Sequence, residues 1–254
     1  MYDPRNFPIL IFLLSFTGLW FSAKIGAIVQ NSQRDLVEDD RKDLNTVQAA
    51  TLTLLGLIIA FSFSMAVSRY DQRKNLEAEE ANAIGTEYVR ASLLPPEKAE
   101  KVQQGLRAYL HQRILFYETR GFRESRLKQI ETDTVRVETE LWSSVQGVAA
   151  VQPAPTIALV VSGLNDVLNS RGYTQAAWWN RIPSAAWSLM ALIAVFCSFL
   201  TGYSVHRSCT LTLLVVPLAV SIAFFLIADI DSPHGGLIHV LPQNLVYLSS
   251  SLGN

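Results

Sequence analysis

Acidic and histidine side chains gather in one short stretch near the end of the sequence, DIDSPHGGLIH. Its four side chains with metal-binding chemistry are Asp229, Asp231, His234 and His239. Carboxylates and imidazoles are common ligands of divalent cations. The alternative is a capped turn, in which Asp and Pro end a helix and the two glycines allow a bend. The small number of oxygen ligands favours the turn, so we expect no cofactor and keep Asp229 with Asp231 as a hypothetical calcium site.

A second acidic run, NLEAEEANAIG, follows an apolar segment and continues it with helical spacing. Carboxylates at the mouth of an ion path attract cations and repel anions unless neighbouring arginines neutralise them. The alternative is a solvated helix whose charges pair at i, i+3 and i, i+4, as Arg73 would with Glu77. The residues assigned to such a cytoplasmic mouth are Arg69, Arg73, Glu79, Glu80 and Asn82, with Glu87 and Arg90 further along.

Small hydroxyl side chains interrupt the apolar segment LLGLIIAFSFSMAVSRYDQR. At about 100° per residue, Thr51 and Ser62 fall on one face of a helix. One interpretation is helix packing, because small residues let membrane helices approach and hydroxyls bond across them. The other is a pore lining in which Leu57 and Phe61 form a hydrophobic constriction. The pattern alone favours packing, and the residues that share the candidate pore face are Thr53, Leu57, Ala60, Phe61, Ser64 and Ser68.

The sequence gives no support to enzymatic chemistry. It holds no nucleophile and base at motif spacing, no glycine-rich phosphate loop and no His-Glu-x-x-His signature. Cys197 and Cys209 both stand in apolar sequence without ligand spacing, which is typical of buried thiols. Asn165 and Asp166 are explained by hydrogen bonds between subunits or by a helix cap. We therefore expect a protein that is not an enzyme.

The composition is that of a membrane protein. Half of the 254 residues are hydrophobic, 17% are charged, and the mean hydropathy is +0.23. The formal net charge of −1 lacks the basic excess that binding to nucleic acid needs. Four stretches have the about 20 apolar residues that cross a bilayer. They are residues 6–29, 47–67, 182–205 and 208–228.

The first apolar stretch also has to be weighed as a signal peptide. It is longer than a typical signal core, and Trp20 and Phe21 stand where small residues should precede cleavage. We therefore expect an uncleaved span, with Lys24 reaching the membrane surface through its long side chain.

The 113 residues between the second and third spans form a charge-balanced region. They hold 15 of the 21 Lys and Arg and 14 of the 22 Asp and Glu. Apolar residues recur at helical spacing over 102–117 and, more weakly, over 127–145. Breaks are predicted at Pro95-Pro96, Gly121, Pro153 with Pro155, and Gly172. The region is therefore predicted to be a bundle of three or four amphipathic helices.

These features predict an all-α integral membrane protein. Residues 1–68 hold the first two transmembrane helices, 69–181 a cytoplasmic helical region, 182–228 the last two transmembrane helices, and 229–254 an interfacial C-terminal segment. The basic residues that flank the spans are nearly evenly divided between the two sides. From them we expect both termini in the cytoplasm.

A family resemblance favours the pore interpretation. It is carried by LGLIIAFSFSMAVSRYDQR, EEANAIGTEYVRASLLP, GLNDVLNSRG, IPSAAWSLMALIAVFCSFLTGY and DIDSPHGGLIHVLPQNL. In this order and over most of residues 47–245, the chain resembles the bestrophin-like family of bacterial membrane proteins. That family is remotely similar to bestrophins, pentameric anion channels with four membrane helices and cytosolic termini.

The resemblance implies roles for particular residues. Placing Arg69-Tyr70 on the bestrophin arginine and tryptophan that end the second span puts Thr53, Leu57 and Phe61 at the pore neck. Phe61 keeps an aromatic ring there, whereas Thr53 and Leu57 depart from the usual bulky residues, which implies a wider or differently gated neck. The calcium-binding cluster of bestrophins is a longer acidic run than Asp229 and Asp231.

The function implied is a homo-oligomeric channel, expected to be a pentamer, in a bacterial inner membrane. It would conduct anions such as chloride, with the lipid bilayer and small ions as its other partners and no nucleic acid. The alternative is a non-conducting membrane scaffold or stress-response sensor that binds a partner through its cytoplasmic helices.

Overall fold

The computed structural model of the chain describes residues 6–32, 38–119, 124–151, 154–204, 210–233 and 235–253. Within these ranges every regular element is a helix. Four of the helices are long and apolar enough to cross a membrane. The structure therefore confirms the predicted all-α membrane fold, while His234 and Cys209 lie outside the described residues.

The chain divides into two compact units. The membrane unit comprises Met1–Arg69 and Arg181–His239, and the helical unit comprises Tyr70–Asn180 and Val240–Asn254. One continuous helix of 53 residues, α2 (Glu38–Arg90), contributes to both. The C-terminal segment, which the sequence presents as one interfacial stretch, is shared between the units at residue 239. Its position at a membrane surface stays a prediction.

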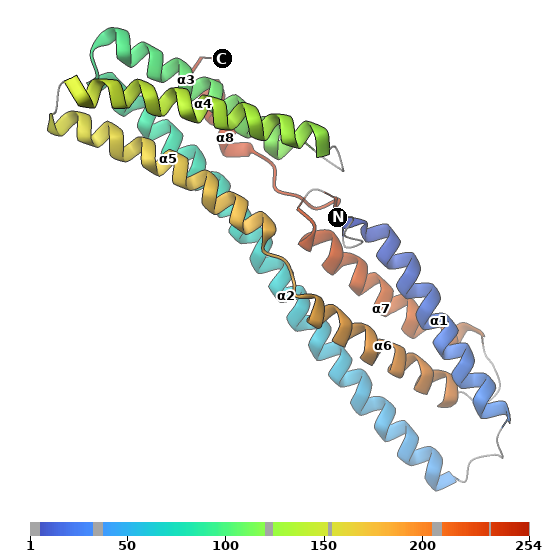
Figure 1. Cartoon of the computed structure of the whole chain (residues 1–254). Helices are drawn as coiled ribbons and strands as arrows, with labels where there is room; N and C mark the ends of the chain where they lie inside the picture. The colour runs from blue at the N-terminus through green and yellow to red at the C-terminus, as the bar shows by residue number, and fades with distance from the viewer. Residues whose placement is uncertain are drawn as a thin grey trace. The chain divides into compact units, whose positions relative to one another are not determined.

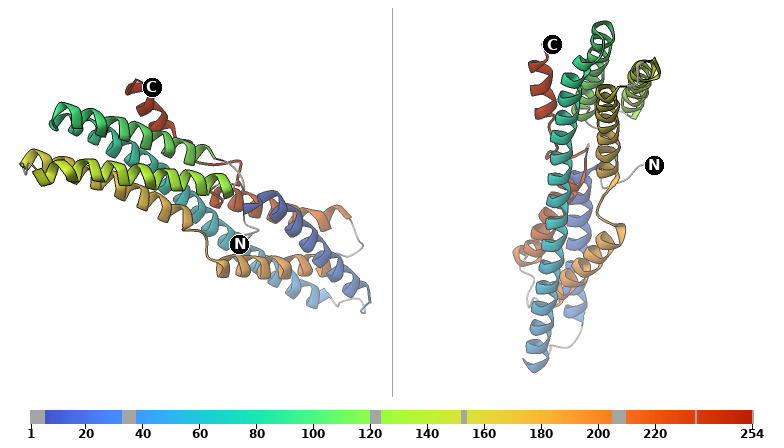
Figure 2. Two further views of the ribbon diagram at one scale, coloured as in Figure 1. Left: turned by 45° about the horizontal axis from the view of Figure 1, so that its top comes forward. Right: turned by 90° about the vertical axis from the view of Figure 1, so that its left-hand side faces the viewer.

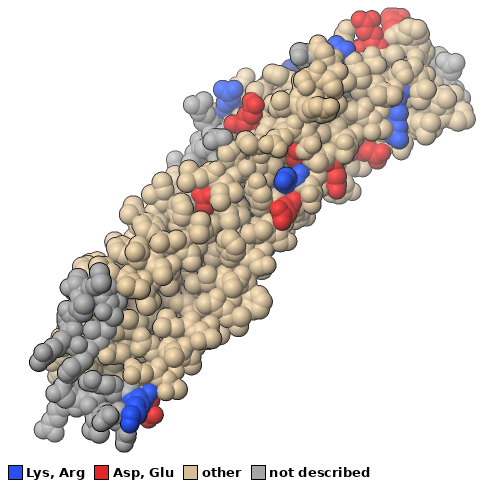
Figure 3. All heavy atoms as spheres, turned by 180° about the vertical axis from the view of Figure 1, so that it is seen from behind, with Lys and Arg blue, Asp and Glu red and all other residues tan. Residues whose placement is uncertain are grey.

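The membrane unit is built from α1 (Pro8–Ser32), the first part of α2, α6 (Ser184–Ser204) and α7 (Thr210–Asp231). Each overlaps with most of one of the four predicted spans. α1 packs against α6 and α7 (Figure 1). Pro217 lies inside α7 without ending it, as membrane helices tolerate. A long stretch of the surface shown in Figure 3 carries almost no charged side chains, as expected for helices in contact with lipid.

Two glycines let α1 and α6 cross at close range. A Cβ atom on Gly26 would lie 2.1 Å from the Phe199 carbonyl oxygen, and one on Gly202 would lie 1.8 Å from the Ala23 carbonyl oxygen. Both values are far inside van der Waals contact, so only glycine fits at either position. Nearby, the Ser22 hydroxyl donates to the Val195 carbonyl at 2.8 Å. Backbone proximity and this interhelical hydrogen bond stabilise the crossing without bulky side chains.

We expect Gly202→Ala to destabilise the membrane unit by about 1–3 kcal/mol, because the added methyl group forces the two backbones apart. Thermal unfolding of the full chain in detergent measures the change. Gly18→Ala is the matched control on α1, since no atom beyond its own stretch of helix lies within 4 Å of its added Cβ. Equal effects of the two substitutions would contradict the close crossing.

The helical unit contains the rest of α2, η2 (Ala91–Leu93), α3 (Pro96–Glu118), α4 (Glu124–Val151), α5 (Pro155–Trp179) and α8 (Gln243–Ser251). α4 packs against α3 and α5, and α8 packs against α3 (Figure 2). Pro96 and Pro155 stand in the first turn of their helices, where a missing N–H costs nothing. The break predicted at Gly172 is wrong, because this residue lies inside α5.

The predicted apolar stripes form the core of the helical unit. Leu106, Leu110 and Leu141 are almost completely buried. Leu245 of α8 is also fully buried in this core, which attaches the last helix to the unit. The other buried members of the two stripes are Val102, Tyr109, Arg113, Tyr117, Ile130, Val137 and Val145.

An ion pair lies at the centre of this core. Glu80 is 0% exposed, and its carboxylate accepts hydrogen bonds from the Nε and Nη2 atoms of Arg113, the second at 3.3 Å. Three hydroxyls complete its shell: Tyr109 at 3.5 Å, Tyr117 at 3.4 Å and Thr174 at 3.4 Å. Donors from α3 and α5 therefore converge on one carboxylate of α2.

The electrostatics keep the tyrosine and arginine donors around Glu80 protonated. Burial raises the pKa of the Tyr109 and Tyr117 hydroxyls, and the Glu80 charge raises it further, so both remain donors. Burial alone would lower the pKa of the Arg113 guanidinium, but Glu80 outweighs burial and holds it above its ordinary value. The guanidinium also lies 4.5 Å from the centre of the Phe116 ring.

Arg113→Met should lower the free energy of unfolding by about 3–5 kcal/mol, because it leaves the Glu80 carboxylate buried without its counter-charge. Thermal unfolding in detergent measures this loss. Arg136→Met on α4 is the control, since Arg136 forms only exposed pairs with Asp133 and Glu140 and should change little. A small effect at Arg113 would show that the pair does not hold the unit together.

Candidate ion pathway

One face of the membrane part of α2 packs inside the subunit. Leu55, Ser62 and Ala66 are buried, and their spacing of seven and four residues places them on one side of the helix. Ser62 therefore acts as a small packing residue. The prediction that it falls on a different face from Ser64 agrees with this placement.

The opposite face of α2 is uncovered in the subunit. Leu57 is 51% exposed and Phe61 is 63% exposed. Thr53, Ala60, Ser64 and Ser68 are exposed as well. The Thr53 hydroxyl bonds back to the Ala49 carbonyl at 2.9 Å, so it can stay in an apolar setting without another partner. All six predicted residues share one open face, and their lining of a pore stays a prediction.

Exposed residues recur with the same helical spacing in the part of α2 that belongs to the helical unit. They follow Ser68 at spacings of three or four residues: Gln72, Asn75, Glu79, Asn82 and Thr86, all exposed. Sequence reasoning did not identify Gln72, Asn75 and Thr86. The signal was present in the spacing, which keeps the same phase through the whole of α2. We call the entire set, from Thr53 to Thr86, the open stripe.

The structure separates the residues predicted to form a cytoplasmic mouth. Glu79 and Asn82 are exposed on the open stripe, and Arg69 is half-buried. Arg73 and Glu80 are 2% and 0% exposed and lie on the opposite face of α2, which packs inside the helical unit. Glu80 therefore stabilises the core through Arg113 rather than facing an entrance.

Glu77 also has a structural partner that its spacing from Arg73 did not indicate. Its carboxylate accepts the backbone N–H groups of Asn244 at 2.9 Å and Leu245 at 3.0 Å, and the Asn244 side-chain amide at 2.6 Å. These groups belong to the first turn of α8, where the helix dipole favours an anion. Glu77 thus caps the last helix from a distant part of the chain.

The acidic residues in the last turn of α7, Asp229 and Asp231, accept hydrogen bonds from the backbone. Asp231 accepts the Ile182 N–H with both oxygens, at 3.2 and 3.3 Å. Asp229 accepts the N–H groups of Leu237 at 2.7 Å and Ile238 at 2.8 Å. Within the described ranges no three His, Cys, Asp or Glu side chains come close enough to hold a metal. His234 lies outside them, so a calcium site at Asp229 and Asp231 stays an untested hypothesis.

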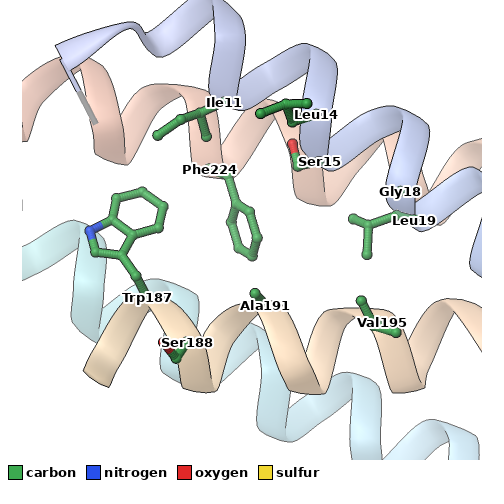
Figure 4. A pocket seen from close by; sticks show the side chains of 10 residues that line it. All are labelled: Ile11, Leu14, Ser15, Gly18, Leu19, Trp187, Ser188, Ala191, Val195 and Phe224. Atoms are coloured by element: carbon green, nitrogen blue, oxygen red, sulfur yellow. The ribbon is translucent and has the colours of Figure 1, made fainter. Parts of the chain in front are cut away.

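An apolar groove of about 460 Å³ lies between α1, α6 and α7 (Figure 4). Phe224 projects into it between the helices, and Trp187 stands at one end. Ser15 offers no free donor, because its hydroxyl bonds to the Phe12 carbonyl at 3.1 Å. The remaining lining residues are Ile11, Leu14, Gly18, Leu19, Ser188, Ala191 and Val195. This lining is mainly apolar and holds no charged side chain.

Comparison with known proteins supports the resemblance found in the sequence. The family described as Bestrophin-like domain matches residues 18–245. A solved structure of a bacterial Bestrophin homolog from Klebsiella pneumoniae is 16% identical, covers 96% of this chain and 95% of that chain, and has a TM-score of 0.61. A mutant of that homolog is 14% identical over 95% and 93% of the two chains, with a TM-score of 0.62. No curated protein matches the sequence.

If the open stripe faces water, Ser64→Cys and Ser68→Cys should react in liposomes with a charged thiol reagent that does not enter lipid. Ser62→Cys is the matched control, because Ser62 is 2% exposed and should react slowly or not at all. The unmodified chain gives the background from Cys197 and Cys209. Protection of positions 64 and 68 would place this face against lipid or protein.

Proposed function

Because the chain belongs to the bestrophin-like family, we propose that it forms a homo-oligomeric ion channel whose pore is lined by α2. The observation that carries the proposal is the open stripe. A helix that spans a membrane usually buries its small and polar residues against its own neighbours. Here Ser64 and Ser68 stay uncovered within the subunit, on the same face as Leu57 and Phe61.

The residues of the stripe suit a path for ions. Brought around a symmetry axis, copies of Leu57 and Phe61 would form adjacent apolar rings, and such rings gate pores by excluding water. The hydroxyls of Thr53 and of Ser64 stand on the two sides of these rings along the helix. They would supply hydrogen bonds to ions or water where the apolar rings cannot.

The proposed assembly is a pentamer in a bacterial inner membrane, with both termini and the helical unit in the cytoplasm. The family resemblance supports the subunit number. In the single subunit, large apolar residues of the membrane unit such as Phe61 are more than half exposed. Lipid and neighbouring subunits would cover them.

We propose chloride as the conducted ion, following the family. The open stripe adds a constraint, because its charged member beyond the membrane part is the acidic Glu79, while Arg73 is buried. A ring of carboxylates lowers the local concentration of anions. The exposed Lys74 lies five residues before Glu79 on a different face of α2, so it does not pair with this carboxylate within one subunit.

The test is ion flux into liposomes that contain the purified oligomer, under separate chloride and potassium gradients. Phe61→Ala should raise flux several-fold, because removing the ring widens the apolar constriction. Phe63→Ala is the matched control: Phe63 is also exposed, but it lies off the open stripe, so flux should not change.

Three outcomes are distinguishable. Chloride flux that rises only in the Phe61 variant supports the proposal, and potassium flux with the same pattern supports a channel of the opposite selectivity. No flux from an intact oligomer, in the original chain and in the Phe61 variant, would favour the non-conducting scaffold.

A further inference from the structure

Glu87 is a buried carboxyl group that lacks the donors its neighbours on α2 possess. It is 0% exposed, and neither of its oxygens has a hydrogen-bond partner among the described residues. On the same buried face, Glu80 is paired with Arg113 and Glu77 caps α8. A buried ionised carboxylate without donors is costly, so the neutral acid is the form that fits this environment.

The backbone of α5 closes over this carboxyl group. A Cβ atom on Gly163 would lie 1.9 Å from the Glu87 Oε2 atom and 2.7 Å from the Arg90 Nη1 atom. Glycine is therefore required where α5 passes α2, and no space is left for water on that side. Solvation of a charge on Glu87 would require the two helices to separate at Gly163.

The charged groups that face Glu87 are few. On its own helix the neighbour is Arg90, and on α5 it is Asp166, which lies 4.0 Å from the Arg90 guanidinium. The Arg90 guanidinium therefore also interacts with Asp166, a carboxylate that is more exposed than Glu87. Burial raises the pKa of Glu87 to about 8; Arg90 lowers it and Asp166 raises it.

We propose that Glu87 is a proton-binding site that couples the packing of α2 against α5 to pH. With the proton bound, the neutral acid sits against Gly163 and the helices stay in contact. Loss of the proton to bulk water leaves a carboxylate that must be hydrated, so α5 moves away from α2 at this point. No other group is consumed or changed in this step.

The direction of the pH effect follows from the raised pKa. The ordinary pKa of a glutamate carboxyl is 4.5, so the folded chain binds more protons than the unfolded chain between pH 4.5 and about 8. The stabilisation from the neutral acid is complete below this window and is lost as pH rises through it. Packing at Gly163 should therefore loosen on the alkaline side.

Hydrogen exchange of the full chain in detergent tests the site without reference to conduction. From pH 6 to pH 9, after correction for the intrinsic exchange rate, protection of residues 157–167 should fall several-fold in the original chain. Glu87→Gln keeps a neutral side chain of the same shape and should show protection that does not change with pH. Glu97→Gln, an exposed acid on α3, should behave like the original chain.

A constant protection in the original chain, or a loss that persists in the Glu87 variant, would overturn the proposal. Asp166→Asn keeps the test decisive if the Glu87 variant fails to fold. Because Asp166 raises the pKa of Glu87, its neutral replacement should shift the midpoint of the transition to lower pH. An unchanged midpoint would also count against the site.

A consequence for conduction rests on the proposed channel function, since α2 carries both Phe61 and Glu87. Flux in liposomes should then change between pH 6 and pH 9 in the original chain and stay constant in Glu87→Gln. If hydrogen exchange shows the pH transition but no flux is measured at any pH, the proton-binding site at Glu87 is supported and the proposed channel function is contradicted.

Discussion

The two faces of α2 set the conditions for the rest of the structure. One face is buried for most of the helix and carries Arg73, Glu77, Glu80 and Glu87 in the helical unit. Each carboxylate there needs donors, a helix terminus or a proton, because an unpaired charge is costly inside a protein. Arg113 supplies donors to Glu80, and the first turn of α8 supplies a helix terminus to Glu77. This requirement fixes how α3, α5 and α8 pack around α2.

The other face is defined by what the subunit does not cover. From Thr53 to Thr86 this face presents hydroxyl and amide side chains, three apolar residues and one carboxylate, all on the same side of the helix. None of the described residues of the subunit covers this face. The proposed channel would explain both the exposure and the composition of this face, because a symmetric assembly would place the stripe around a shared axis.

Much of the fold could be predicted because its causes are local. About 20 apolar residues define a span, and Pro96 and Pro155 begin helices because proline needs no N–H there. The rotation of about 100° per residue also correctly placed Ser62 and Ser64 on different faces of α2. Partners distant in sequence could not be predicted: Arg113 follows Glu80 by 33 residues, and α8 meets Glu77 across most of the chain. The break predicted at Gly172 was wrong because a glycine only weakens a helix, and tertiary packing can keep such a helix continuous.

The proposed channel requires the open stripe of α2 to surround a path through an oligomer. An experimental structure of the assembled protein in a lipid nanodisc would show whether it does. We expect a ring in which α2 lies closest to the symmetry axis, with the side chains of Leu57 and Phe61 at the narrowest point of the pore. An assembly in which α2 faces lipid, and another helix lies at the axis, would contradict this expectation.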